Sequence, residues 1–387
     1  MNQKEISELR RRFQPEKSAI SRVYGCYVNT NREIISDLDE SLGQMPVEEA
    51  EKYLSLLKKT LSGTLGRNLI DIVFSSQQVM DSEEHRLLSA LRSTGLKDRA
   101  LRQEFYEKVI EALDMGESNY LLLLAHDEYD VPRRGKSVDS GSDLDSDSVF
   151  SYILCCVCPV KDGKMELGYF AGENEFHGCS ASQIVSPPET GFLFPAFDDR
   201  AANIYNALFY TKDAGRLHQE FIDAVFRTEA PMSAAEQRET FEAVLQETLE
   251  DGCSMEVVQS VHERLREKIQ RHKEEKDPEP LEVTSREIGT ILESCGVPQE
   301  KAEAFQKGCE ERFGGGALNP ANLIDAGRFE IKTPEATVSV DPEQSYLVET
   351  RVIDGRRYLL IPVEKGVEIN GLPVEIVSAP SEEETAE

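Results

Sequence analysis

The segment Ser148–Val160 is almost entirely apolar and contains no charged residue. Successive side chains of a β-strand point to opposite faces of its sheet, so a strand with apolar residues at consecutive positions is buried. A second apolar run, Tyr120–Ala125, precedes it in the chain. Neither run approaches the roughly 20 apolar residues that a membrane-spanning helix needs. The two runs therefore predict paired core strands of a globular domain, and no association with a membrane is expected.

Eight cysteines occur in 387 residues, which is too sparse for a disulfide framework. Cys155, Cys156 and Cys158 lie in the later apolar run, where cysteine acts as a small hydrophobic residue. A structural zinc site would need a second ligand pair, and His177 with Cys179 is the only plausible one. We therefore expect buried free thiols, no metal and a reducing compartment. Because residues 1–13 lack the apolar run of a signal peptide, the sequence predicts a cytoplasmic protein.

The rest of the pattern divides the chain into three parts. Residues 1–214 combine strand-like runs with helical 3–4 spacing and predict a mixed α/β domain of sheet and helices. Residues 215–314 are rich in Glu, Lys and Arg and predict a helical region, in which Thr284 and Glu287 have the spacing of a capping box. Residues 315–387 predict a small β-rich module with an acidic tail, because turn signals such as Asp354-Gly355 separate short apolar runs. The expected fold class is α+β.

A polar segment, residues 131–148, joins the two predicted core strands. It is rich in Ser, Asp and Gly, so burial cannot offset its ordering entropy of about 1–2 kcal/mol per residue. We expect this segment to be mobile. The alternative is a calcium site, but the bidentate Glu that usually closes a calcium loop is missing here.

The N-terminus carries a local excess of positive charge in a strongly acidic chain. The chain has 43 Lys and Arg against 72 Asp and Glu, a net charge of −29, and such a surface repels nucleic acid on average. Residues 1–22 reverse the sign, with six basic side chains against three acidic ones. A clustered positive face is enough to bind phosphates. The candidate nucleic-acid-binding residues are Arg10, Arg11, Arg12, Lys17 and Arg22. The alternative is that the consecutive arginines complement the C-terminal dipole of the first helix.

The densest polar cluster, His126–Asp130, directly follows the apolar run that ends at Ala125. Residues at the ends of strands often carry function, and a histidine among carboxylates can hold a divalent metal or act as general acid and base. The candidate catalytic residues of a metal-assisted hydrolase or nuclease are His126, Asp127 and Asp130. A second carboxylate set, such as Asp198 and Asp199, would have to converge with them. The alternative is a solvated strand end.

Several sequence blocks, spread over nearly the whole chain, are specific when taken together. They are MNQKEISELRRRF, AISRVYGCYV, LKKTLSGTLGRNL, YLLLLAHDEYDVP, SYILCCVCPV, GFLFPAFDDR, FEIKTP and LVETRVIDGRRYLLIPV. On these blocks the chain resembles the uncharacterised family catalogued as domain of unknown function 4317. The resemblance brings no established activity and no site with it.

The order of the parts is also similar to that of bacterial nucleoid-associated proteins of the NdpA/YejK kind. In those proteins too, a mixed domain with two apolar strands is followed by a helical stretch and a small β tail. The corresponding stretches here lie near residues 221–312 and 329–373. The similarity is one of layout and not of a residue motif, and it implies DNA as a partner.

The sequence contains none of the phosphate-loop, dinucleotide, zinc-protease or nucleophile-elbow motifs, and no cofactor is expected. We therefore predict a non-enzymatic cytoplasmic binding protein. Two kinds of partner stay open: DNA, in a nucleoid-associated role, or a protein recruited by the helices and the β tail. The alternative function is the metal-assisted hydrolase or nuclease that would use the acidic cluster after residues 120–125.

Overall fold

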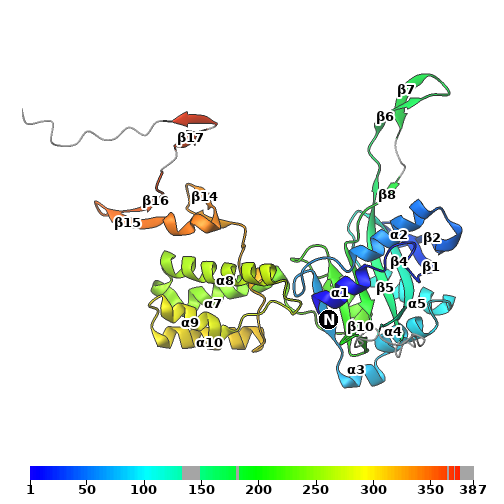
Figure 1. Ribbon diagram of the computed structural model, residues 1–387, viewed down its shortest axis with the longest axis horizontal. Coiled ribbons are helices and arrows are strands. Elements are labelled where there is room, and N and C mark those ends of the chain that lie inside the picture. The colour runs from blue at the N-terminus through cyan, green and yellow to red at the C-terminus, as the bar shows by residue number, and fades with distance from the viewer. Residues whose placement is uncertain (133–148, 180–182, 364–365, 370, 375–387) are drawn as a thin grey trace, which may run out of the picture. The chain divides into compact units, whose positions relative to one another are not determined.

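The computed structural model describes residues 1–132, 149–179, 183–363, 366–369 and 371–374, and Glu166 by its backbone alone (Figure 1). Most of the segment predicted to be mobile, residues 133–148, lies outside the described residues, so that expectation stays a prediction. The chain forms two compact units, one built mainly from residues 1–242 and the other from residues 243–270, 284–316 and 324 onward. The fold is α+β, as the sequence predicts.

The first unit is organised around one antiparallel sheet with the strand order β2-β1-β4-β5-β9-β12-β3. Its strands are β1 (Arg22–Val28), β2 (Ile34–Ser41), β3 (Leu69–Val73), β4 (Asn119–Asp130), β5 (Val149–Asp162), β9 (Thr190–Phe194) and β12 (Asn206–Thr211), with β8 (Gln183–Val185) paired to the end of β5. The predicted pairing of the two apolar runs is confirmed, because β4 pairs antiparallel with β5 along its whole length, from Asn119 opposite Val160 to Asp130 opposite Val149.

Helices cover both faces of this sheet. One core contains residues of α4 (Glu83–Ser93), α5 (Arg99–Ala112) and α6 (Gln219–Phe226), and the other contains residues of α1 (Gln3–Arg10) and α2 (Val47–Lys59). Consecutive residues of β5 alternate between them: Cys155 belongs to the first core, and Cys156 and Cys158 to the second. Because both faces are covered, β5 is apolar at nearly every position. The prediction of buried free thiols in this strand is confirmed.

Shorter elements complete the first unit. They are the 3-10 turn η1 (Leu42–Gln44), the helices α3 (Ser76–Asp81) and α11 (Pro320–Leu323), and the hairpin of β10 (Ala196–Asp198) with β11 (Ala201–Asn203). A further ribbon, β6 (Glu166–Phe170) with β7 (Glu175–Cys179), follows β5. We call this ribbon the arm. Its two strands pair only with each other within the described residues (Figure 1).

The second unit is helical and ends in hairpins. Helix α7 (Ala234–Leu249) enters it from the first unit and is followed by η2 (Glu250–Gly252), α8 (Met255–Glu275), α9 (Ser285–Ser294) and α10 (Gln299–Phe313). Val257, Val261 and Leu265 are buried at helical spacing on α8. The predicted capping box opens α9, with Thr284 and Glu287 bonded reciprocally. No helix of the described residues is long and apolar enough to cross a membrane.

The predicted β tail consists of separate two-stranded ribbons. They are β13 (Phe329–Lys332) with β14 (Thr337–Val340), β15 (Glu349–Ile353) with β16 (Arg356–Leu360), and β17 (Val367–Ile369) with β18 (Leu372–Val374); η3 (Pro342–Leu347) lies between the first two. The turn of the middle ribbon is the predicted Asp354-Gly355, and both residues have positive φ, 51° and 76°. Such a turn matches the twist of the strands that it joins.

Candidate functional site

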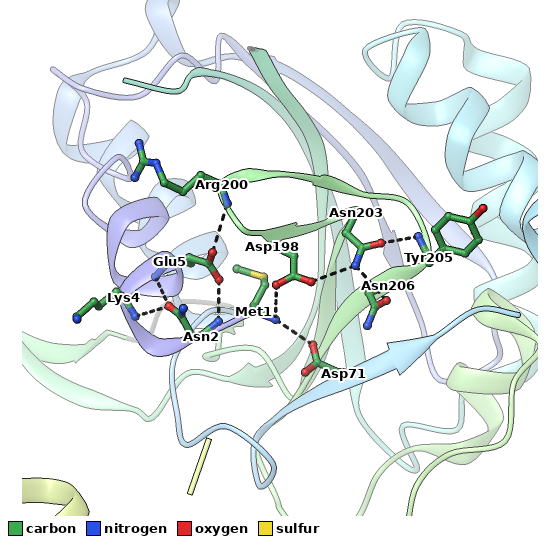
Figure 2. A network of polar contacts seen from close by, with 10 residues as sticks. All are labelled: Met1, Asn2, Lys4, Glu5, Asp71, Asp198, Arg200, Asn203, Tyr205 and Asn206. Atoms are coloured by element: carbon green, nitrogen blue, oxygen red, sulfur yellow. Dashed lines mark hydrogen bonds and ion pairs between the residues drawn. The ribbon is translucent and has the colours of Figure 1, made fainter. Parts of the chain in front are cut away.

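The first helix lies at the centre of a polar network that contains many of the residues singled out from the sequence. Its start is fixed by a capping box: the Asn2 side chain accepts from the Glu5 amide at 3.1 Å, and Glu5 accepts from the Asn2 amide at 2.8 Å (Figure 2). Ile6 and Leu9 are fully buried against the sheet. The capping box and these two side chains together place α1 on one face of β4, β5 and β10.

The α-amino group of Met1 lies between two carboxylates in Figure 2. It is 3.8 Å from Asp71 Oδ1 on β3 and 3.7 Å from Asp198 Oδ1 on β10. Asp198 also accepts a hydrogen bond from Asn203 Nδ2 at 3.1 Å. Burial raises the pKa of Asp71; the amino group opposes this effect and Asp198 adds to it. The amino group therefore joins the start of α1 to two strands.

Arg12, just after α1, pairs with the carboxylate of Asp127 on β4. The closest approach is 3.3 Å, from Arg12 Nη2 to Asp127 Oδ1, and Asp127 is only 2% exposed. The Tyr152 hydroxyl donates to Asp127 Oδ2 at 2.6 Å. Burial, together with the Asp127 charge, raises the pKa of Tyr152 well above its usual value, so this hydroxyl stays protonated as a donor. The buried carboxylate thus has both an opposite charge and a hydrogen-bond donor.

The Arg12 side chain is engaged on other sides as well. Its guanidinium lies 4.4 Å from the ring centroid of Tyr129, within cation–π range, and donates to the Glu128 carbonyl at 3.0 Å. These contacts hold Arg12 against the end of β4. Arg12 was a candidate of the basic patch, and Asp127 was a candidate of the acidic cluster. The structure pairs these two residues with each other.

Glu8 forms a second pair that ties α1 to the β10–β11 turn. Arg200 Nη1 lies 2.5 Å from Glu8 Oε2, and Tyr129 donates its hydroxyl proton to Glu8 Oε1 at 2.5 Å. Burial and this hydrogen bond raise the pKa of Tyr129 to about 12. Asp199 and Arg200 both have positive φ, 48° and 60°, a conformation that costs non-glycine residues energy. The contacts of Arg200 offset part of that cost.

The remaining residues of the predicted basic patch lie in different surroundings. Arg22 is partly exposed and pairs with Asp39 on the neighbouring strand β2. Arg11 and Lys17 are exposed, whereas Arg10 is half-buried, with no hydrogen-bond partner for its Nε within the described residues. Of the five candidates, Arg11, Lys17 and Arg22 are thus exposed, and Arg22 is paired with Asp39.

The candidate catalytic residues do not converge. Strand β4 continues to Asp130, so the acidic cluster lies within the strand and not after it, because β5 supplies pairing partners as far as Val149. His126 lies on the opposite face of the sheet from Asp127 and contacts Ser151 Oγ at 2.9 Å. Burial lowers the pKa of His126. Asp130 is exposed. Within the described part of the chain, no group of three or more His, Cys, Asp or Glu side chains could hold a metal ion.

The second carboxylate set is also elsewhere. Asp198 is engaged by the Met1 amino group and Asn203, and Asp199 belongs to the strained turn. Around α1 the charged groups form ion pairs, such as Arg12 with Asp127 and Arg200 with Glu8. A metal or a substrate would have to reach the Asp127 carboxylate, which is buried. The arrangement is suited to holding α1 on the sheet. It does not offer an open acid–base site.

The arm differs from this network because it exposes large apolar side chains. On one face of the ribbon Leu167, Tyr169 and Phe176 are 75%, 52% and 68% exposed. Tyr169 and Phe176 are directly opposed across the strands, with ring centroids 5.0 Å apart. Met165, just before β6, is 76% exposed. This apolar face is the second candidate site of the molecule.

Sequence reasoning missed Glu8, Tyr152 and the arm as features of interest. Glu8 could have been identified from its spacing in the sequence. Glu5, Glu8 and Arg12 are three and four residues apart, so they lie along one side of the first helix, next to the buried Leu9. Tyr152 lies within an apolar run and reads as a core residue. In the arm, Leu167 and Tyr169 alternate as in any half-buried strand, so nothing in the sequence marks their face as uncovered.

Comparison with known proteins places the chain in a family. Residues 1–372 match the domain of unknown function DUF4317. The chain belongs to the DUF4317 family. No curated protein matches it. The family membership that the sequence blocks indicate is therefore confirmed, whereas the similarity in layout to nucleoid-associated proteins has no support from these comparisons.

Proposed function

We propose that this member of the DUF4317 family is a non-enzymatic cytoplasmic protein that binds a protein partner through the arm. The observation that carries the proposal is the apolar face of Leu167, Tyr169 and Phe176, each more than half exposed. A two-stranded ribbon by itself is at best marginally stable in water. Covering a side chain of this size contributes about 1.5–3 kcal/mol. Both arguments favour a face that a partner covers.

Charge indicates the chemistry of that partner. The segment from Met165 to Gln183 contains no Lys or Arg, whereas Glu173 lies in the turn of the arm and Glu175 directly follows it. A second copy of the chain is an unfavourable occupant, because two molecules of net charge −29 repel each other. The partner that fits is a different protein with an apolar groove bordered by Lys or Arg, which also favours fast association.

The cytoplasmic part of the proposal rests on the cysteines. All eight thiols are free. Cys26, Cys155, Cys156 and Cys158 are fully buried in the two cores of the first unit. Free thiols in this number are typical of a reducing compartment.

A photoreactive phenylalanine analogue placed at Tyr169 of the full chain in cells tests the proposal. The matched control is the same analogue at Tyr205, an exposed tyrosine outside the arm. We expect one discrete crosslinked protein from position 169 and none from position 205. That protein, once purified, should bind the full chain, and the double substitution Leu167→Ala with Phe176→Ala should weaken the Kd by about tenfold or more.

Three results would overturn the proposal. The first is the absence of a discrete crosslinked protein at position 169, and the second is equal crosslinking at position 205. The third is an unchanged Kd for the purified partner after the double substitution. Each of them would show that the exposed apolar face is not a binding surface.

DNA binding by the N-terminal patch stays a prediction of the sequence. Arg12 and Arg22 are engaged by Asp127 and Asp39, so its test relies on the exposed Arg11 and Lys17. Retention of DNA that falls steeply with rising salt, and is lost on replacing both residues by Glu, would support it. Retention that is unchanged in that variant would exclude the patch. The hydrolase alternative has no converging residues behind it, and we do not carry it further.

A further inference from the structure

The arm extends the strand pair of β5 and β8 in an unchanged register (Figure 1). Val160 of β5 is opposite Val185 of β8, and Leu167 of β6 is opposite Gly178 of β7. Leu167 lies seven residues after Val160, and Gly178 lies seven residues before Val185, so the two ladders have the same offset. The strands β5 and β6 therefore form one side of a long antiparallel ribbon, and β7 and β8 form the other.

The outer edge of β6 continues the side of β5 on which β4 lies. Val160 pairs with Asn119 of β4 as well as with Val185 of β8, and a strand residue has one neighbour on each side. The strand β4 begins at Asn119 and does not reach β6. Within the described residues no strand pairs with β6 on that side, so its outer backbone N–H and C=O groups are free to pair with another strand.

This edge lacks the features that usually prevent strand addition. Proteins protect exposed edge strands with charged side chains, proline or bulges. The two end strands of the main sheet follow this rule, since β2 contains Asp37 and Asp39 and β3 has Asp71 at its centre. Residues 167–170 of β6 are Leu-Gly-Tyr-Phe, without a charge or a proline. The sequence of β6 thus permits pairing that the sequences of β2 and β3 oppose.

The side chains favour the edge of β6 over the edge of β7. On the apolar face of the arm, β6 contributes Leu167 and Tyr169, whereas β7 contributes Phe176 and Gly178. Glycine offers no side chain for a neighbouring strand to pack against. Apolar and aromatic pairs across adjacent strands stabilise a sheet, and three strands with an apolar face are stable where two are marginal. A strand beside β6 would therefore gain the larger contact.

We propose, resting on the function proposed for the arm, that the partner presents an extended segment that pairs with the outer edge of β6. This segment forms one wall of the apolar groove inferred for the partner. Its alternate side chains are apolar, because they lie on the face of Leu167 and Tyr169. The side chains between them lie on the opposite face with Glu175, which is exposed, and are therefore Lys or Arg. Main-chain hydrogen bonds give such strand addition its affinity, and the alternate side chains give it specificity.

Photocrosslinking from two positions of the full chain in cells tests the geometry of this pairing. A photoreactive phenylalanine analogue is placed at Leu167 or at Tyr169, and mass spectrometry identifies the partner residues that it reaches. We expect both positions to reach one segment, at residues two apart, because residues i and i+2 share a face of a strand. A helix would give residues three or four apart. The control is the analogue at Phe176, on the strand farther from the partner, which should crosslink more weakly than position 169.

A synthetic peptide of the crosslinked segment tests the main-chain hydrogen bonds. N-methylation of every second residue removes the N–H donors along one edge of the peptide, and the complementary set removes those along the other edge. We expect one of the two methylated peptides to bind the full chain about tenfold or more weakly, and the other to bind like the parent peptide. Leu167→Ala should also weaken the parent peptide about tenfold, whereas Val352→Ala, a similarly exposed position on β15, should not.

The outcomes separate this inference from the function on which it rests. Partner residues three or four apart, stronger crosslinking from position 176 than from 169, or equal binding of the two methylated peptides would overturn strand addition alone. Equal effects of Leu167→Ala and Val352→Ala would do the same. If no discrete protein is crosslinked from the arm, the proposed function fails and this inference fails with it.

Discussion

The network around α1 and the arm differ in which side chains they bury and which they expose. Around α1, charged side chains are buried or half-buried and meet opposite charges, as Asp127 meets Arg12 and Glu8 meets Arg200. On the arm, Leu167 and Phe176 are exposed in the part of the chain that the structure describes. In the first region these charged side chains find their ion-pair partners within the chain. The second leaves large apolar side chains exposed within the described residues.

This difference shows that the charged clusters and the proposed binding surface are different parts of the molecule. Arg12 of the basic N-terminus and Asp127 of the acidic cluster, which both attract notice in the sequence, pair with each other and so stabilise the fold. The surface that we propose for binding contains ordinary Leu, Tyr and Phe residues. A dense group of charges therefore indicates a buried network here, and the uncovered apolar face is the better guide to a partner.

Of the substitutions that test this difference, Arg12→Ala should lower the free energy of unfolding most. It leaves Asp127, which is 2% exposed, without its guanidinium partner, and removing one partner of a buried ion pair costs about 3–5 kcal/mol. The free energy of unfolding in urea measures the loss. The control is Arg11→Ala, an exposed neighbour, which should change stability by no more than about 0.5 kcal/mol. Equal losses in the two variants would show that the network does not hold α1.

His126→Gln should have a smaller, pH-dependent effect. Burial lowers the pKa of His126 below the ordinary value of 6.5, so the unfolded chain takes up a proton at a higher pH than the folded chain. The stability that comes from the neutral imidazole is present above pH 6.5 and is lost as the pH falls toward the lowered folded-state pKa.

The measurement is the melting temperature above pH 6.5 and at a pH below the lowered pKa of His126. It should fall less on acidification in His126→Gln than in the parent chain, because the glutamine does not titrate. The other histidines are present in both proteins, so the difference isolates His126. Identical pH dependences would mean that the imidazole is not held neutral by its surroundings.

Phe176→Ala on the arm should have the smallest effect on stability. The side chain is already 68% exposed, so its removal should change the free energy of unfolding by no more than about 0.5 kcal/mol. The matched substitution Phe192→Ala removes a fully buried ring and should cost about 3–5 kcal/mol. Similar losses at both positions would mean that the arm is packed against the chain, and the contrast between the two regions would fail.

Local features were predictable because they depend on neighbours in the chain. The apolar runs of β4 and β5, the capping box at Thr284 and the Asp354-Gly355 turn all follow from residues within a few positions of one another. The strand β3 was missed, because Leu69–Val73 is short and has an aspartate at its centre. The end of β4 was placed too early for a related reason: polar residues from His126 onward looked like a loop, but pairing with β5 extends the strand to Asp130.

The sequence by itself determined the α+β class, the two core strands with their buried cysteines, the family, and the residues Arg12 and Asp127 as points of interest. It could not assign their roles, because they are 115 positions apart and only the docking of α1 onto β4 makes them partners. Tertiary structure likewise decided that His126 and Asp127 lie on opposite faces of one sheet, and that the alternating apolar residues of the arm are exposed among the described residues. Periodicity and turn chemistry act over a few residues, whereas charge pairing and burial depend on which distant segments meet.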